Sequence, residues 1–174
     1  MTDLAKPRIQ SLIEGELSWN EMRNEVLPDP KDPARFEKTR EVLQERVDWD
    51  DPVLVPLNDH LYVVGTDEGR VIRAECGEDL CDVDDNWKRS CDVYVREDAD
   101  AFEELYEEYM HVDPDWAFEL REWSCPECHQ LIDVDAVPVG YPVIKPFDPD
   151  IDTFYQEWQG HQAPDRQTDE TAAD

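Results

Sequence analysis

The cysteines are the residues of this chain whose spacing could do chemistry. Two pairs, Cys76–Cys81 and Cys125–Cys128, are separated by 43 residues. Each pair falls where a predicted strand runs into a turn, and a tight turn directs successive sulfurs to one side. Two such turns facing each other form a tetrahedral cage of four thiolates, which Zn²⁺ prefers. The spacing therefore predicts a zinc ribbon with Cys76, Cys81, Cys125 and Cys128 as ligands.

The identity of the metal ligands from the first turn is not decided by the sequence, because four residues separate Cys76 from Cys81 whereas two separate the second pair. Three other residues could replace Cys81: Glu78, Cys91 and His129. As an alternative to ligation, Cys91 is predicted to be a buried core thiol at the start of a strand. The same four thiolates could also hold iron, so a rubredoxin-like electron carrier and a stand-alone zinc-ribbon interaction protein are the alternative functions.

Other roles for the cysteines fit less well. Five is an odd number, which argues against a disulfide framework. A thioredoxin-like role for Cys125 would place it at the N-terminus of a helix, whereas a strand is expected after this turn. Because four thiolates leave the cage at −2 among acidic neighbours, we expect compensation from backbone N–H groups and from Arg73, Lys88 or Arg89.

No catalytic motif accompanies the cysteines. The sequence lacks the GxxxxGK[ST], GxGxxG, HExxH and GxSxG patterns. A closed structural zinc site has no free coordination position for a substrate, so we predict no catalytic residues and no nucleotide-binding residues in this chain. The remaining histidines, His60, His111 and His161, lie far in sequence from the cysteines and are expected to be structural.

The periodicity of apolar residues predicts an α+β protein. Residues 1–50 are expected to be helical, with a capping box of Ser18 and Glu21 and an N-cap and N1 pair of Asp32 and Pro33. The apolar stripes of these helices are thin, so this region is predicted to pack on the remainder of the chain or to dock on another protein.

Residues 51–160 are predicted to form the zinc-ribbon-like domain, with an inserted helix and a short C-terminal helix. A hairpin of 61–64 with 70–73 leads to Cys76, and further strands are expected at 92–96, 116–124 and 132–138. The inserted helix begins near Asp100 and carries apolar residues as far as Met110, while the last helix contains Tyr155. Residues 161–174 are predicted to be a disordered tail.

The charge is the other prominent feature of the sequence. With 16 basic and 45 acidic residues the formal net charge is −29, which repels phosphate backbones and anionic lipid headgroups. We therefore expect neither nucleic acid nor membrane as a partner. Such a charge suits a cytosol of high salt, where repulsion is screened, so a halophilic source is inferred, with masking by a large partner as the alternative. The N-terminus has no apolar signal segment, so a cytoplasmic location is predicted.

The C-terminal half of the sequence resembles a known family. The chain is similar to the small γ subunit of acetone carboxylase, including the related acetophenone carboxylases, over roughly residues 70–160. The resemblance rests on these segments: 86–88, 94–96, 113–116, 119–122, the CPEC turn at 125–128, 136–143 and 150–158. At the first turn, where family members often have Cys-x-Cys-Gly-His, this chain has Ala74-Glu75-Cys76-Gly77-Glu78.

The resemblance implies a role and partners. It implies a noncatalytic, zinc-binding small subunit that assembles with larger α and β subunits into an α2β2γ2 ligase complex. In that family, ATP and manganese are expected on the large subunits, and the complex converts acetone and bicarbonate to acetoacetate. The departures at the first turn leave the ketone substrate of this chain open.

Overall fold

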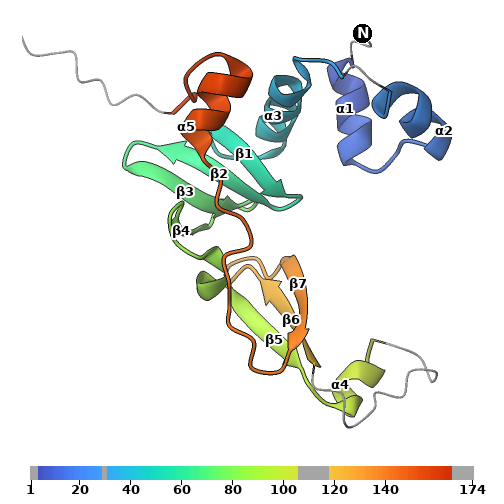
Figure 1. Cartoon of the computed structure of the whole chain (residues 1–174), viewed down its shortest axis with the longest axis vertical. Coiled ribbons are helices and arrows are strands. Elements are labelled where there is room, and N and C mark those ends of the chain that lie inside the picture. The colour runs from blue at the N-terminus through green and yellow to red at the C-terminus, as the bar shows by residue number, and fades with distance from the viewer. Residues whose placement is uncertain (1–3, 29–30, 106–117, 166–174) are drawn as a thin grey trace, which may run out of the picture.

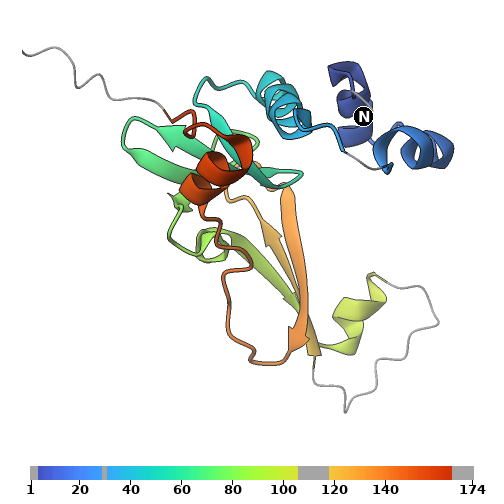
Figure 2. The same cartoon turned by 45° about the horizontal axis from the view of Figure 1, so that its top comes forward.

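The computed structural model describes residues 4–28, 31–105 and 118–165. It confirms an α+β protein in which helices at both ends of the chain pack on a four-stranded sheet, and a separate three-stranded sheet lies below it (Figures 1 and 2). The two sheets carry one pair of predicted metal ligands each. Their approach to one another therefore decides whether a metal centre can form.

The first sheet consists of antiparallel strands in the order β1-β2-β3-β4. The strands are β1 (Val53–Asn58), β2 (Leu61–Thr66), β3 (Gly69–Ala74) and β4 (Asp79–Asp82). The predicted hairpin is confirmed as β2 and β3, which pair from Leu61↔Ala74 to Thr66↔Gly69. Strands β1 and β4 were not predicted, because Pro56 interrupts the first and the second has only four residues.

Strand β2 is the centre of the core. Its first five residues are buried although they alternate between the two faces of the sheet. On one face Tyr62 and Val64 pack with Leu43 of the helix α3 (Arg35–Arg46). On the other face Val63 packs with Ile151 and Tyr155 from the C-terminus. The sheet is therefore covered on both faces by segments from opposite ends of the sequence.

The N-terminal region is helical, as predicted. It comprises α1 (Lys6–Ile13), α2 (Trp19–Glu21), a π-helical turn η1 (Met22–Val26) and α3. The capping box is confirmed, because the Ser18 side chain accepts from the Glu21 N–H and the Glu21 carboxylate accepts from the Ser18 N–H. Buried residues of the first helices pack on Val42 of α3, which joins them to the sheet through Leu43. Docking of this region on another protein stays a prediction.

The predicted start of α3 was wrong by two residues. Asp32 does not cap the helix, which begins at Arg35 after Ala34. Instead, the Asp32 carboxylate accepts a hydrogen bond of 2.9 Å from the Ala34 N–H and one of 2.6 Å from Lys38 Nζ. A carboxylate can accept from several donors at once. Asp32 therefore stabilises the turn before α3 and also binds Lys38 in the first turns of that helix.

The second sheet has the order β5-β6-β7, also antiparallel. Its strands are β5 (Asp92–Arg96), β6 (Phe118–Ser124) and β7 (Leu131–Pro138), close to the predicted ranges. A 3₁₀ turn, η2 (Trp87–Ser90), connects the two sheets. The inserted helix α4 (Ala99–Glu103) begins after an Asp98 N-cap, two residues before the predicted Asp100, because the Asp98 side chain accepts from the Ala101 N–H. The rest of the predicted helix and the first two residues of the predicted strand at 116–124 fall within residues 106–117, which lie outside the described residues.

After β7 the chain runs back past the second sheet to the first (Figure 1). There it forms α5 (Ile151–Thr153) and a second π-helical turn, η3 (Phe154–Gln159), at the predicted C-terminal helix. Part of the predicted tail is placed, since Asp165 accepts two hydrogen bonds from Arg70 at 3.0 and 2.7 Å. Residues 166–174 lie outside the described residues.

Replacing Tyr155 by phenylalanine should destabilise the first sheet. The buried Tyr155 hydroxyl donates to the Leu54 carbonyl at 2.7 Å, and Leu54 lies at a register shift between β1 and β2. Loss of a donor to a buried acceptor costs about 1–3 kcal/mol. Urea unfolding of Tyr155→Phe is expected to show that loss. Tyr94→Phe, at a half-exposed tyrosine, is the control and should change the unfolding free energy by less than about 0.5 kcal/mol.

Candidate metal centre

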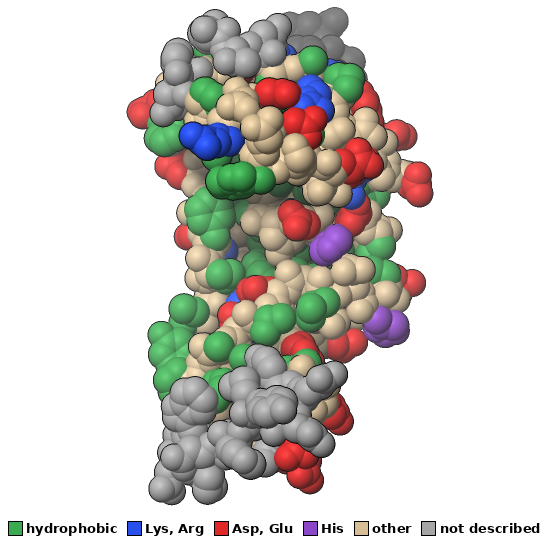
Figure 3. All heavy atoms as spheres, turned by 90° about the vertical axis from the view of Figure 1, so that its right-hand side faces the viewer, with side chains coloured by type: hydrophobic (Ala, Val, Ile, Leu, Met, Phe, Trp, Pro, Cys, Tyr) green, Lys and Arg blue, Asp and Glu red, His purple; other side chains and the backbone are tan. Residues whose placement is uncertain are grey.

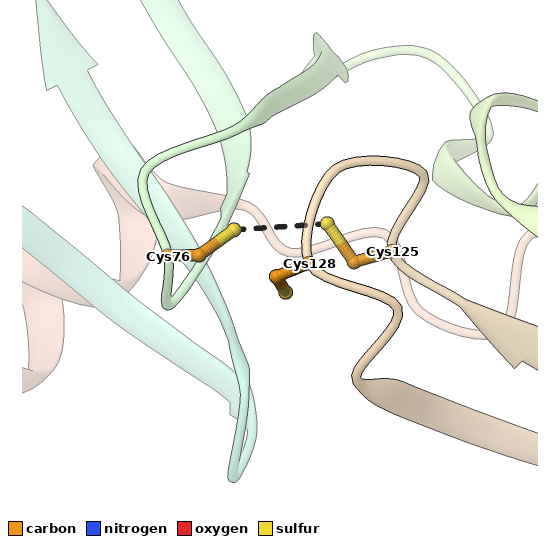
Figure 4. A group of neighbouring side chains, drawn as sticks. All are labelled: Cys76, Cys125 and Cys128. Atoms are coloured by element: carbon orange, nitrogen blue, oxygen red, sulfur yellow. Dashed lines mark hydrogen bonds between the residues drawn. The ribbon is translucent and has the colours of Figure 1, made fainter.

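Two hairpin turns from different sheets face each other (Figure 4). The first joins β3 to β4, where the Ala74 N–H donates to the Glu78 carbonyl at 2.9 Å. The second joins β6 to β7, where the Cys125 N–H donates to the Gln130 carbonyl, also at 2.9 Å. Each turn therefore closes on its own backbone and presents its cysteines toward the other sheet.

Three sulfurs meet between these turns. The Sγ atoms of Cys76, Cys125 and Cys128 all lie within 4.8 Å of one another, and Cys76 Sγ is 3.7 Å from Cys125 Sγ. This separation is far longer than the roughly 2.05 Å of a disulfide. It matches the edge of about 3.8 Å expected between two sulfurs of a tetrahedron with Zn–S near 2.3 Å. The donor set thus fits a thiophilic metal ion such as Zn²⁺.

The structure brings together three of the four predicted ligands. Cys81 lies within β4 opposite Ile72 and packs against the core between the sheets, so its sulfur is outside the group of three. Cys91 is half-buried rather than fully buried as predicted; it packs against the same core, and its S–H donates to the Trp87 carbonyl at 3.5 Å. The other proposed substitutes, Glu78 and His129, are also outside the group. The four-cysteine ligand set stays a prediction.

The pKa values of the clustered thiols are shifted in opposite directions. Burial raises the pKa of Cys76 to about 12, and the neighbouring Cys128 and Cys125 add to this effect. The pKa of Cys128 is lowered, first because the Gln130 backbone N–H donates to its sulfur. A bound divalent cation deprotonates its thiol ligands, so metal uptake has to displace a proton from Cys76. Metal affinity is therefore expected to fall as the pH falls.

Two of the three basic residues expected beside the site pair with carboxylates, and the third, Arg89, is exposed. Arg73 binds Asp51 at 2.7 Å and also Asp79, and Lys88 binds Asp133 and Asp135. A cation that lines the cavity beside the cysteines is Arg46 of α3, which is 3.5 Å from the Glu75 carboxylate. Sequence reasoning missed Arg46, since nothing in its spacing connects a helix residue to a turn 30 positions later in the chain.

The cysteines line one wall of a cavity of about 280 Å³. The remaining wall includes polar side chains from α3, from the loop that follows it, from the β1–β2 turn and from the two hairpins: Arg46, Asp48, His60, Glu75 and Gln130. Within the part of the chain that the structure describes, this is where thiols, an imidazole and carboxylates come together. The arrangement can hold a metal on three sulfurs and leaves one coordination position to be filled.

Gly77 allows the first turn to form, because its φ is +101° and a Cβ there would lie 3.3 Å from Trp49 Cδ1. Gly77→Ala is expected to cost about 1–3 kcal/mol through backbone strain, and in addition to displace the Trp49 ring. Zinc titration and urea unfolding should both show the defect. Gly140→Ala is the control, since Gly140 also has positive φ but open space around it. Equal losses of zinc affinity in both variants would contradict a local role for Gly77.

Sequence comparisons show the family to which the chain belongs. Residues 47–159 match the sequence model of the family described as acetone carboxylase gamma subunit. The acetone carboxylase gamma subunit of Xanthobacter autotrophicus is 42% identical over 163 residues, covering 92% of this chain and 96% of that protein. The chain belongs to the acetone carboxylase gamma subunit family. Both hairpin turns lie inside the matched region, and the similarity to the Xanthobacter protein extends over most of the sequence.

Among the described residues, no helix is both long and apolar enough to span a membrane. The longest described helix, α3, has 12 residues, whereas a membrane span needs about 20.

Proposed function

We propose that this chain is the zinc-binding, noncatalytic small subunit of an ATP-dependent ketone carboxylase. The observation that carries the proposal is the 42% identity to an acetone carboxylase gamma subunit over nearly the whole length of both chains. In this proposal the chain assembles with larger α and β subunits as α2β2γ2, and those subunits hold ATP and manganese. The complex converts acetone, or a related ketone, and bicarbonate to acetoacetate or its analogue.

The donor set supports zinc with a structural role. Thiolates dominate structural zinc sites, whereas catalytic zinc sites are commonly built from histidine and carboxylate ligands with one water. Cys76 comes from the first sheet, and Cys125 and Cys128 come from the second. An ion held by all three ties the sheets together at this point. Metal binding then contributes directly to the folding free energy.

Exposed aromatic side chains support assembly with other chains. Trp19 near the N-terminus and Trp158 near the C-terminus are 72% and 77% exposed. Figure 3 shows further hydrophobic side chains on one face of the protein, above and below the constriction between the two sheets. Large aromatic side chains are enriched at subunit interfaces. In a chain with a net charge of −29, apolar surface of this kind is consistent with burial against partner subunits.

Co-expression with the large carboxylase subunits tests the assembly. Affinity purification of this chain is expected to recover both large subunits in a fixed ratio, with one zinc per small subunit. A monomer that separates cleanly from the large subunits would refute the proposal. A coloured preparation that contains iron would instead favour the rubredoxin-like electron carrier.

Metal replacement tests the noncatalytic role. Within the purified complex, exchange of the zinc on this chain for Cd²⁺ is expected to leave kcat for ketone carboxylation unchanged, because Cd²⁺ also binds thiolates tetrahedrally but is a different Lewis acid. A tenfold or larger change in kcat, with the complex still intact by size-exclusion chromatography, would assign the ion a catalytic role.

A further inference from the structure

Three thiolates leave a tetrahedral ion with one ligand missing. Structural zinc sites are almost always four-coordinate, with Cys₄, Cys₃His or Cys₂His₂ donors. The group of three sulfurs therefore needs a fourth donor from a residue nearby. Cys81 is held in β4 and packs against the core, so it can reach this group only if the strand is rearranged.

His60 lies beside the three sulfurs, in the lining of the same cavity. It belongs to the β1–β2 turn, which is fixed by a 2.9 Å hydrogen bond from the His60 N–H to Asn58 Oδ1. The His60 carbonyl accepts from the Glu75 N–H, also at 2.9 Å, and Glu75 immediately precedes Cys76. The imidazole lines the same cavity as the three cysteines. Backbone pairing therefore anchors His60 beside the first hairpin turn.

The ring of His60 is oriented by partners from both hairpin turns. Nδ1 lies 2.9 Å from Glu75 Oε2, and Nε2 lies 3.3 Å from Gln130 Nε2. A carboxylate on Nδ1 keeps the proton there and leaves the Nε2 lone pair available, which is the arrangement that carboxylates impose on metal-binding histidines. Gln130 belongs to the turn between β6 and β7, so its side-chain contact with Nε2 relates this nitrogen to the turn that carries Cys125 and Cys128.

We propose that His60 Nε2 is the fourth ligand of the metal bound by Cys76, Cys125 and Cys128, with Glu75 as the positioning residue on Nδ1. This inference rests on the proposed metal binding. The ring is outside the group of atoms that lie within 4.8 Å of one another, so Nε2 exchanges its contact with Gln130 for the ion when the metal binds. The Cys₃His centre has a charge of −1 rather than the −2 of four thiolates.

Charge and geometry favour His60 over the neighbouring donors. In a chain with a net charge of −29, a neutral imidazole adds less repulsion than a fourth anion. The Glu75 carboxylate is already engaged by His60 and Arg46. His129 follows Cys128 directly in the second turn, is exposed, and is not among the residues that line the cavity. His129 is therefore a suitable control histidine.

X-ray absorption at the zinc edge of the full-length wild-type protein tests the proposal without any variant. We expect three sulfurs near 2.3 Å and one imidazole nitrogen at about 2.0–2.1 Å. Four sulfurs would overturn the proposal and would favour Cys81 as the fourth ligand. Three sulfurs with a non-imidazole oxygen would also overturn it. Absence of any bound metal would refute the proposed metal binding itself, and the inference with it.

Matched histidine variants identify the residue. In His60→Gln the imidazole scattering is expected to disappear, and the visible bands of the Co²⁺-loaded protein should shift, while His129→Gln should leave both unchanged. Persistence of the imidazole signal in His60→Gln would overturn the proposal. Glu75→Gln should keep the imidazole signal but weaken Zn²⁺ binding by about 10–100-fold in a chelator competition, as loss of a ligand-positioning partner does. Glu75→Gln also provides a test if His60→Gln does not fold.

Discussion

Cys125→Ser is expected to abolish stoichiometric zinc binding and to loosen the core between the two sheets. Cys125 is fully buried, and its side chain belongs to the same apolar cluster as Trp87 and Trp123. Apparent binding free energies of structural zinc in small domains reach about 10–16 kcal/mol, which is comparable with the total stability of a typical domain. Loss of a central ligand should therefore remove a large part of the stability of this region.

Metal analysis and tryptophan signals measure this effect together. Zinc content of Cys125→Ser is expected to fall from one ion per chain to a trace, and the near-ultraviolet circular dichroism of the buried tryptophans should collapse. Cys91→Ser is the matched control, because Cys91 packs against the same core but is not in the group of three. It should retain one zinc. Full zinc content and an unchanged spectrum in Cys125→Ser would show that the clustered sulfurs do not bind the ion.

Lys88→Met is expected to destabilise the second sheet by about 1–3 kcal/mol, less than for a fully buried ion pair because the carboxylate partners of Lys88 are partly exposed. Lys88 is only 2% exposed, and its Nζ lies 2.7–2.8 Å from carboxylate oxygens of Asp133 and Asp135 on β7. Trp123 Nε1 also donates to Asp135, at 2.9 Å. Without the ammonium group, two neighbouring and partly exposed carboxylates repel each other.

Urea unfolding of the zinc-saturated protein is the appropriate measurement, since it keeps the metal contribution constant. The exposed neighbour Arg89 provides the control, and Arg89→Met should change the unfolding free energy by less than about 0.5 kcal/mol. Adding Asp133→Asn and Asp135→Asn to Lys88→Met is expected to recover part of the loss, because the repulsion is then removed. If Lys88→Met is as stable as Arg89→Met, the buried ion pairs do not stabilise the sheet.

Much of the fold could be predicted from local patterns. Alternation of apolar residues identified β2, β3 and β7, and the Ser18 and Glu21 capping box marked the start of α2. Strand β1 was missed because Pro56 interrupts its apolar pattern. The strand is stabilised by the helices packed on the sheet rather than by a strand pattern of its own. The start of α3 was misplaced because the Asp32 carboxylate binds Lys38 as well as the turn backbone.

The metal centre could be predicted only in part. The Cys125–Cys128 pair and Cys76 were found by spacing, because a short turn places nearby sulfurs together. Spacing could not show that Cys81 lies within a strand, since the end of the first turn depends on where β4 pairs with β3. The predicted hairpin of β2 with β3 already places His60 beside Glu75. What spacing could not show is the contact of His60 with Gln130 in the second sheet, because local periodicity does not encode how the two sheets approach each other.

The packing of Tyr155 on β2 has a consequence for synthesis of the protein. The first sheet is translated early, but one of its faces is covered by Ile151 and Tyr155, which follow the second sheet in the sequence. The first sheet therefore cannot complete its core until residues 151–155 have been translated. A stop codon before residue 151 would leave the nascent N-terminal sheet with an open apolar face, as a substrate for chaperones and proteases.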